Sequence, residues 1–196
     1  MTVDEYKLFP TLVTRVSDVL TARQCADAFA YIKTLKMFEH TALEGDAKST
    51  FENGKSHLLQ QIALNVRSCK NICADIALTV SDYATRTQMQ VEEIGNSWAS
   101  VQDKDSRLTK HTHPLSVVSG VLYIKVDADS SKLHLYNPNP FIKFTPYTKL
   151  SEFNFNSFWF APKIGEVILF PSWMLHDSGG EFNQTKDRTI ISFNTA

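Results

Sequence analysis

The sequence predicts an α+β protein that is mainly β, with a helical N-terminal half followed by a barrel or jelly roll of short strands. Up to about residue 87, apolar residues recur every three or four positions, as on one face of a helix. From residue 88 onward the period changes to two, and the aromatic and β-branched residues concentrate there with six of the seven prolines. We expect one domain over residues 1–196, in which helical residues 1–87 support a β core at 88–196.

The first half is expected to hold two helical regions. The segment TARQ at residues 21–24 is a capping box, so a helix should run from Thr21 to about Lys36. Farther along, eight apolar residues share one stripe of a helix, or of two helices in succession: Leu59, Ile62, Val66, Cys69, Cys73, Ile76, Val80 and Tyr83. Because no opposed charges flank the stripe, we expect it to cover the outer face of a sheet rather than form a coiled coil. Cys25, Cys69 and Cys73 are expected to be structural thiols.

Eight segments of the second half have strand length and strand pattern, and turn residues separate them. They are residues 89–94, 97–102, 117–126, 132–138, 141–147, 152–160, 166–171 and 188–194. This number of short strands is typical of a barrel or a jelly roll.

Composition excludes several classes of partner. The formal net charge is −1, and Lys and Arg are scattered, which gives no electrostatic footprint for docking on nucleic acid. The N-terminal residues MTVDEYKLFP lack the basic and apolar regions of a secretory signal, and no window is apolar enough to cross a membrane. We therefore expect a cytoplasmic protein with no membrane partner.

Three histidines of the β half are candidate metal ligands. His111 and His113 stand one residue apart, and His176 follows a strand that ends at Pro171. A jelly roll can bring such distant strand ends to one mouth, where three imidazoles would converge on a metal ion. The spacing alone is equally compatible with polar residues that bind nothing. His134, His40 and His57 are expected to be ordinary core or surface histidines.

The residues around these histidines resemble a known family. The strings HTHP (111–114), SGVLYI (119–124), KLHLYNP (132–138), GEVILFPSWMLH (165–176) and RTIISFN (188–194) look like those of 2-oxoglutarate- and iron(II)-dependent oxygenases, in particular a poorly characterised bacterial and phage subfamily. The resemblance extends from about Ser97 to the C-terminus, with weaker similarity at YKLFP (6–10).

The resemblance implies a double-stranded β-helix, a jelly-roll and cupin-like fold, whose cofactors are Fe(II) and the cosubstrate 2-oxoglutarate. It makes His111 and His176 the proximal and distal iron ligands. It also implies that Arg188 pairs with the distal carboxylate of 2-oxoglutarate, a role that suits the planar guanidinium fork. Tyr123 matches a position that donates a hydroxyl to the same carboxylate, although it could equally be a core aromatic residue.

One residue departs from the family pattern. Most such oxygenases have Asp or Glu two residues after the first histidine, where this chain has His113. His113 either completes a three-histidine site, which is the alternative we favour, or stands aside and leaves a position for water or halide, or marks a site that has lost its iron. Asp177 is not expected to replace the carboxylate, because in an extended segment it points to the opposite side from His176.

The implied activity is that of a dioxygenase, an oxidoreductase that couples oxidative decarboxylation of 2-oxoglutarate to hydroxylation of a C–H bond. The substrate is an unidentified small molecule or side chain. Two other interpretations remain open: a metal-dependent cupin enzyme without 2-oxoglutarate, and a silent jelly roll that only binds a ligand. Four further residues are candidates for the lining of the mouth, although packing is the commoner role for such residues: Trp98, Phe170, Trp173 and Asn194.

Overall fold

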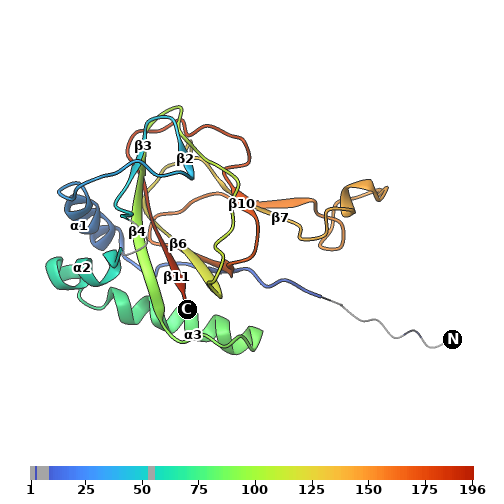
Figure 1. Ribbon diagram of the computed structural model, residues 1–196, viewed down its shortest axis with the longest axis horizontal. Helices are drawn as coiled ribbons and strands as arrows, with labels where there is room; N and C mark the ends of the chain where they lie inside the picture. Colours follow the sequence, from blue (N-terminus) through green and yellow to red (C-terminus); the bar gives the residue numbers. More distant parts are fainter. Residues whose placement is uncertain (1–2, 4–8, 53–55) are drawn as a thin grey trace.

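The structure is a computed structural model that describes residues 3, 9–52 and 56–196. A six-stranded antiparallel sheet forms its centre (Figure 1). In spatial order its strands are β1 (Thr14–Val16), β9 (Val167–Pro171), β6 (Val118–Lys125), β11 (Arg188–Thr195), β4 (Ile94–Gln102) and β3 (Ala47–Ser49). The N-terminal half therefore contributes both edge strands, which the sequence analysis did not predict.

A smaller antiparallel sheet faces the six-stranded one and closes the barrel. Its strands, in order, are β10 (His176–Asp177), β7 (Leu133–Tyr136) and β8 (Ser157–Phe160). A third sheet has two strands, β2 (Leu43–Glu44) and β5 (Arg107–Leu108). Apolar side chains from the facing sides of the six-stranded and the three-stranded sheet meet in one cluster, to which β7 contributes Leu133 and Leu135 and β6 contributes Val121.

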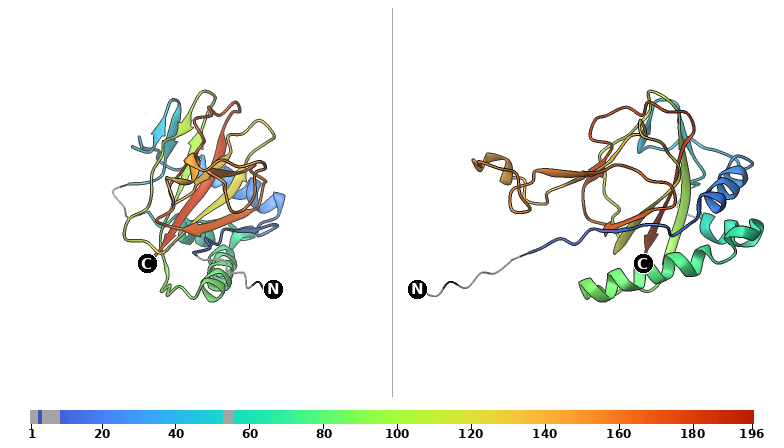
Figure 2. Two further views of the ribbon diagram at one scale, coloured as in Figure 1. Left: turned by 90° about the vertical axis from the view of Figure 1, so that its right-hand side faces the viewer. Right: turned by 180° about the vertical axis from the view of Figure 1, so that it is seen from behind.

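Three helices cover the outer face of the six-stranded sheet (Figures 1 and 2). They are α1 (Ala22–Ile32), α2 (Leu58–Asn65) and α3 (Ile72–Thr87), and a short 3-10 helix, η1 (Arg67–Cys69), connects the last two. The capping box at Thr21 is present, with the Gln24 amide donating to the Thr21 hydroxyl. The expected apolar stripe packs on the sheet, and seven of its eight residues are buried, while Cys73 is half-buried. Burial raises the pKa of the thiols of Cys25, Cys69 and Cys73, as expected for structural cysteines.

The first helix ends four residues earlier than predicted, at Ile32 instead of Lys36. After Ile32 the chain makes tight turns, in which the Leu35 amide donates to the carbonyl of Ile32. Phe38 then exchanges two backbone hydrogen bonds with Ser49 of β3. This pairing with a distant segment outcompetes further helix, and helical periodicity alone does not reveal it.

Two of the eight predicted strands are wrong as drawn. Residues 89–94 are not a strand, because β4 begins only at Ile94. Residues 141–147 contain a 3-10 helix, η2 (Ile142–Phe144), in place of a strand. Its cause lies just before it, where the side-chain oxygens of Asn137 and Asn139 accept backbone amides two residues ahead and turn the chain.

The segment that contains η2 forms an arm between β7 and β8 that stands away from the barrel (Figure 2). Several of its aromatic residues are exposed, among them Phe141, Phe144 and Phe153. Of the N-terminal string YKLFP, residues 6–8 lie outside the described part of the chain. Among the described helices, none has the length and apolar character that a membrane crossing requires.

Candidate active site

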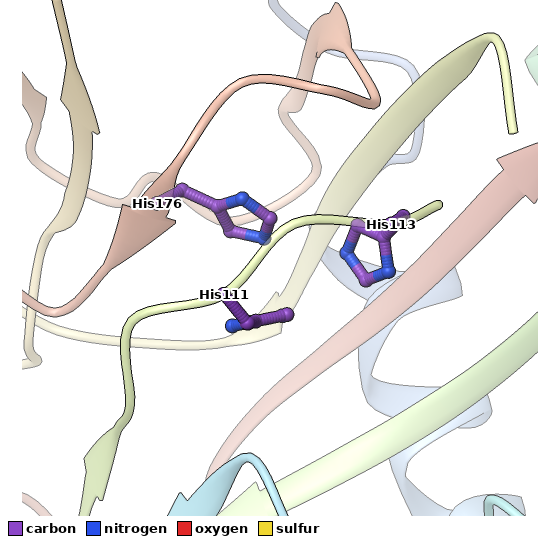
Figure 3. Close-up of side chains that lie close together, drawn as sticks. All are labelled: His111, His113 and His176. Atoms are coloured by element: carbon purple, nitrogen blue, oxygen red, sulfur yellow. The ribbon is translucent and has the colours of Figure 1, made fainter. Parts of the chain in front are cut away.

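The side chains of His111, His113 and His176 lie close together (Figure 3). Each offers one ring nitrogen, and these three nitrogens lie within 4.8 Å of one another. The backbone imposes this arrangement: His111 and His176 exchange two backbone hydrogen bonds of 3.0 Å, and the His113 amide donates to the Ser172 carbonyl at 2.9 Å. Strand pairing between segments 65 residues apart thus assembles the cluster.

Hydrogen bonds fix the tautomers of two rings. Nδ1 of His111 lies 2.8 Å from the carbonyl oxygen of Thr109, and Nδ1 of His176 lies 2.9 Å from that of Met174. A carbonyl oxygen only accepts, so each Nδ1 must carry the hydrogen and each Nε2 must present a lone pair. This is the orientation that metal-bound histidines adopt when their second nitrogen is anchored.

The three rings are neutral at neutral pH. Burial lowers the pKa of His111, lowers that of His113 to about 4 and lowers that of His176 to about 3. The proximity of the other rings lowers the last two pKa values further. Three neutral imidazoles with converging nitrogens suit a divalent transition metal such as Fe(II).

Asp177 is not part of this cluster. Its carboxylate accepts the hydroxyl of Tyr136 and the amide of Gly179. The donor set available to a metal ion within the described residues therefore has three imidazoles and no carboxylate.

Arg188 is a buried cation without a counterion. Its side chain is 5% exposed, and its Nε donates to the carbonyl of Ser131 at 3.2 Å while Nη1 donates to the amide oxygen of Gln102. No carboxylate among the described residues pairs with it. Arg15, by contrast, donates to the carboxylate of Glu166 at 2.5 Å.

Buried polar atoms without hydrogen-bond partners among the described residues lie near Arg188. The hydroxyl of Tyr123, the hydroxyl of Ser131 and the amide nitrogen of Gln102 are buried, and none has a hydrogen-bond partner in the described part of the chain. Leaving such groups unpaired is costly, and they are all able to donate. A buried guanidinium with three unpaired hydrogen-bond donors beside it is a suitable binding site for a carboxylate.

The histidines and Arg188 line one pocket, together with Tyr123. Alternate residues of β11 form its floor, from Arg188 through Ile190 and Ser192 to Asn194. Asn194 stands six positions after Arg188, which corresponds to roughly 20 Å of strand. The pocket thus has two ends, one at Arg188 and one at Asn194.

The sequence analysis predicted an ordinary core or surface role for His40, but His40 lines the pocket. It lies in the N-terminal half, on no predicted element, and its ring stacks on Trp98 at 6.4 Å between centroids with an interplanar angle of 12°. Trp98 in turn lies 5.9 Å from His113. No spacing signal links His40 to the other histidines, because only the pairing of Phe38 with Ser49 places it there.

Other predicted residues divide between pocket and surface. Of the four candidates for the lining, Trp98, Phe170 and Asn194 line the pocket, whereas Trp173 is half exposed and does not. His134 lies outside the pocket, where its ring fills the space beside Gly179. His57 is exposed.

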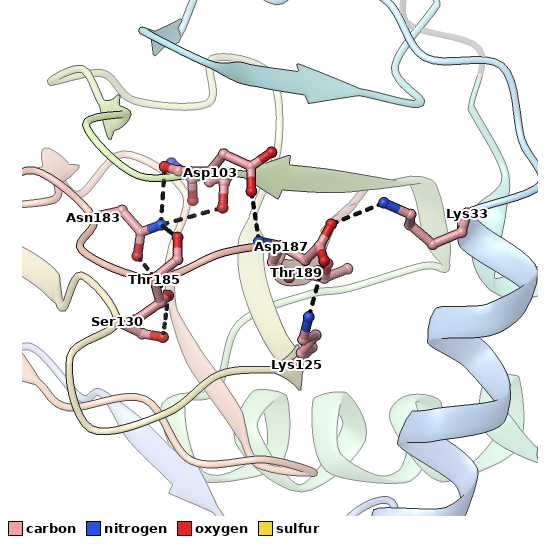
Figure 4. A network of polar contacts seen from close by, with 9 residues as sticks. Lys33, Asp103, Lys125, Ser130, Asn183, Thr185, Asp187 and Thr189 are labelled. Atoms are coloured by element: carbon pink, nitrogen blue, oxygen red, sulfur yellow. Dashed lines mark hydrogen bonds and ion pairs between the residues drawn. The ribbon is translucent and has the colours of Figure 1, made fainter.

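A polar network holds the start of β11 (Figure 4). Asp187, whose backbone is left-handed with φ of 55°, accepts Lys33 at 2.8 Å and Lys125 at 3.1 Å. Its amide donates to the carboxylate of Asp103 at 2.8 Å. The hydrogen bonds from the two lysines are the main cause that keeps the pKa of Asp187 below its usual value. Asp187, the residue directly before Arg188, is therefore held by Lys33 just after α1, by Lys125 of β6 and by Asp103 just after β4.

Comparison with known proteins identifies the family. A family model described as "Putative 2OG-Fe(II) oxygenase" matches residues 96–194, just over half of the chain. The chain belongs to the 2OG-Fe(II) oxygenase family. It is thus a member of an enzyme family whose cofactors are Fe(II) and 2-oxoglutarate, as the sequence resemblance implied.

Solved structures show the same fold for this oxygenase. A prolyl-4-hydroxylase from Pseudomonas putida superposes with a TM-score of 0.65 at 11% identity, covering 93% of this chain and 91% of the other. HygX from Streptomyces hygroscopicus, solved with nickel and 2-oxoglutarate bound, gives 0.65 at 12% identity, covering 95% and 83%. The α-ketoglutarate-dependent epimerase SnoN of nogalamycin biosynthesis gives 0.65 at 12% identity, covering 93% and 75%.

These likenesses confirm the predicted double-stranded β-helix. Among curated protein sequences, none is detectably similar to the oxygenase.

Proposed function

We propose that this oxygenase is a hydroxylase in which His111, His113 and His176 hold Fe(II), and Arg188 and Tyr123 bind the distal carboxylate of 2-oxoglutarate. The substrate is an unidentified small molecule or side chain. The observation that carries the proposal is that the buried Arg188 has no carboxylate partner among the described residues and lies in the same pocket as the three neutral imidazoles.

Each residue has a defined task in this proposal. His111 and His176 donate Nδ1–H to backbone carbonyls, which keeps their Nε2 lone pairs directed into the site. His113 is the third ligand in place of the usual carboxylate. Arg188 presents two N–H groups to the carboxylate, and the Tyr123 hydroxyl donates a further hydrogen bond to it.

Iron and 2-oxoglutarate, when bound, supply oxygen activation, in which one atom of O2 enters succinate as carbon dioxide leaves and the other enters a C–H bond of the substrate. The chain contributes orientation and the exclusion of water. Phe170 and Ile190 are buried beside the histidines and give the site apolar walls.

The cupin interpretation and the silent jelly roll leave Arg188 unexplained. A cupin enzyme without 2-oxoglutarate needs no buried guanidinium, and a purely structural sheet would be more stable with an apolar residue there. The family match adds to this argument, because it extends across the strand that carries Arg188.

The test is binding of 2-oxoglutarate to the zinc-loaded protein, measured by calorimetry, in wild type and in Arg188→Met. We expect the variant to bind at least about 100-fold more weakly, since it removes a charge-assisted bidentate contact. Its melting temperature should change little, because the removal of a buried charge offsets the loss of the hydrogen bonds to Ser131 and Gln102. Arg86→Met, at an exposed i,i+4 pair with Asp82, is the matched control and should bind normally. Equal affinity in Arg188→Met and wild type would reject the assignment.

A further inference from the structure

The pocket end farthest from Arg188 is polar but carries no charge. Three lining residues are charged at neutral pH, namely Lys132, Asp177 and Arg188. Lys132 follows Ser131, which contacts Arg188, so Lys132 lies at the Arg188 end of the pocket. The carboxylate of Asp177 accepts the hydroxyl of Tyr136. The end at Asn194 is instead lined by neutral residues, among them Trp98, Ser119 and Asn194.

His40 presents a donor without a hydrogen-bond partner among the described residues, beside Trp98, which pairs with Ser192 of β11 two residues before Asn194. Its Nδ1 accepts the amide of Ala42 at 3.1 Å, which is possible only if Nδ1 has no hydrogen. The ring is therefore neutral, and Nε2 carries the hydrogen. No acceptor for this N–H is found among the described residues, and stacking on Trp98 with an edge contact from Phe51 fixes the plane of the ring.

The side-chain amide of Asn194 presents a second donor without a hydrogen-bond partner among the described residues. Its side-chain oxygen accepts the hydroxyl of Ser119 at 2.8 Å, and the hydroxyl of Ser172 lies 2.8 Å from that of Ser119. Since Ser119 gives its single hydrogen to Asn194, Ser172 must donate to Ser119. This chain of hydrogen bonds orients the amide so that its nitrogen faces away from Ser119, and the described residues offer that nitrogen no acceptor.

We propose that this end of the pocket is the substrate subsite, and that it takes an uncharged carbonyl-bearing group of the amide class, with an apolar side against Trp98. In this proposal the carbonyl oxygen of the ligand accepts hydrogen bonds from His40 Nε2–H and from the side-chain amide of Asn194. An anionic or cationic group would lose its hydration here without meeting an opposite charge. The inference rests on the proposed function, because the three histidines must hold the metal ion beside this subsite.

The experiment uses the smallest probe of this class, N-methylacetamide, and its anionic counterpart, acetate. Each is added to the zinc-loaded protein with saturating 2-oxoglutarate, and saturation transfer from protein to probe is followed by NMR. Calorimetry on the same sample reports 2-oxoglutarate binding separately. The key variant is His40→Phe, which keeps an aromatic ring on Trp98 but removes the donor. His57→Phe, an exposed histidine outside the pocket, is the matched control.

We expect N-methylacetamide to bind wild type and His57→Phe equally, and His40→Phe about fivefold more weakly, the effect of one neutral hydrogen bond. The acetate signal should be the same in all three proteins. Normal 2-oxoglutarate binding without amide binding, or amide binding that His40→Phe leaves unchanged, would overturn this inference alone. Loss of 2-oxoglutarate binding in the wild type would instead overturn the proposed function.

Discussion

The two faces of β11 differ in what their side chains contact. Ile191 and Phe193 point outward, are fully buried, and pack against the helices. Arg188, Ser192 and Asn194 point inward and line the pocket. One strand thus gives alternate residues to the hydrophobic core and to the candidate active site.

This difference teaches where stability and chemistry are placed. The outer face gains free energy by removing apolar surface from water. The inner face keeps a buried charge and unpaired donors, which cost stability unless a ligand satisfies them. Substitutions on the outer face should therefore change stability and leave ligand binding intact, and substitutions on the inner face should do the reverse.

The largest effect on this comparison is expected from Ile191→Ala. The side chain is fully buried between sheet and helices, so its truncation should lower the free energy of unfolding by about 2–5 kcal/mol. Denaturant unfolding measures the loss, and 2-oxoglutarate affinity should be retained at temperatures where the variant is folded.

The neighbouring residue supplies the control for that prediction. Ser192→Ala lies on the other face of the same strand, where Ser192 is half-buried and lines the pocket. Its unfolding free energy should change by less than about 1 kcal/mol. If the two variants lost equal stability, the division between the faces would be wrong.

A smaller effect is expected from Asp187→Asn, a substitution at the residue directly before Arg188 and the start of β11. The substitution keeps the shape but weakens the contacts with Lys33 and Lys125, so the start of β11 should be held less firmly. We expect 2-oxoglutarate affinity to fall about tenfold in calorimetry, in line with the loss of charge-assisted hydrogen bonds, while zinc affinity stays unchanged. A parallel loss of zinc affinity would mean that the whole site is disturbed.

The same residue predicts a pH dependence. The pKa of Asp187 is lowered in the folded protein, so its stabilisation is complete above the ordinary carboxyl pKa of about 3.9. That stabilisation is lost as the pH falls below this value and through the folded pKa. Asp187→Asn should remove this part of the acid sensitivity.

Local patterns predicted much of the fold and the order of the candidate site residues. The capping box at Thr21, the apolar stripe and the alternation in β6, β9 and β11 are each visible within a short window. His111, His176 and Arg188 stand in the order of the resembled family, and the structure brings them to one pocket.

Long-range pairing set what the sequence did not reveal. His40 reaches the pocket because Phe38 pairs with Ser49, and Gln102 meets Arg188 because they face each other in the register of β4 and β11. The failed strand at 141–147 has a local cause instead, because the turns at Asn137 and Asn139 directly precede it. The end of α1, by contrast, was decided by the distant Phe38–Ser49 pairing. Such contacts join residues that share no spacing rule.

The most direct test of the central claim is an anaerobic titration of the purified oxygenase with Fe(II) and then 2-oxoglutarate, followed by visible absorption. We predict the charge-transfer band of Fe(II) chelated by 2-oxoglutarate in wild type, its loss in His176→Ala, and its persistence in His134→Ala, since His134 lies outside the pocket. Iron binding without that band, or a band that His176→Ala leaves unchanged, would contradict the assignment of the three histidines and Arg188.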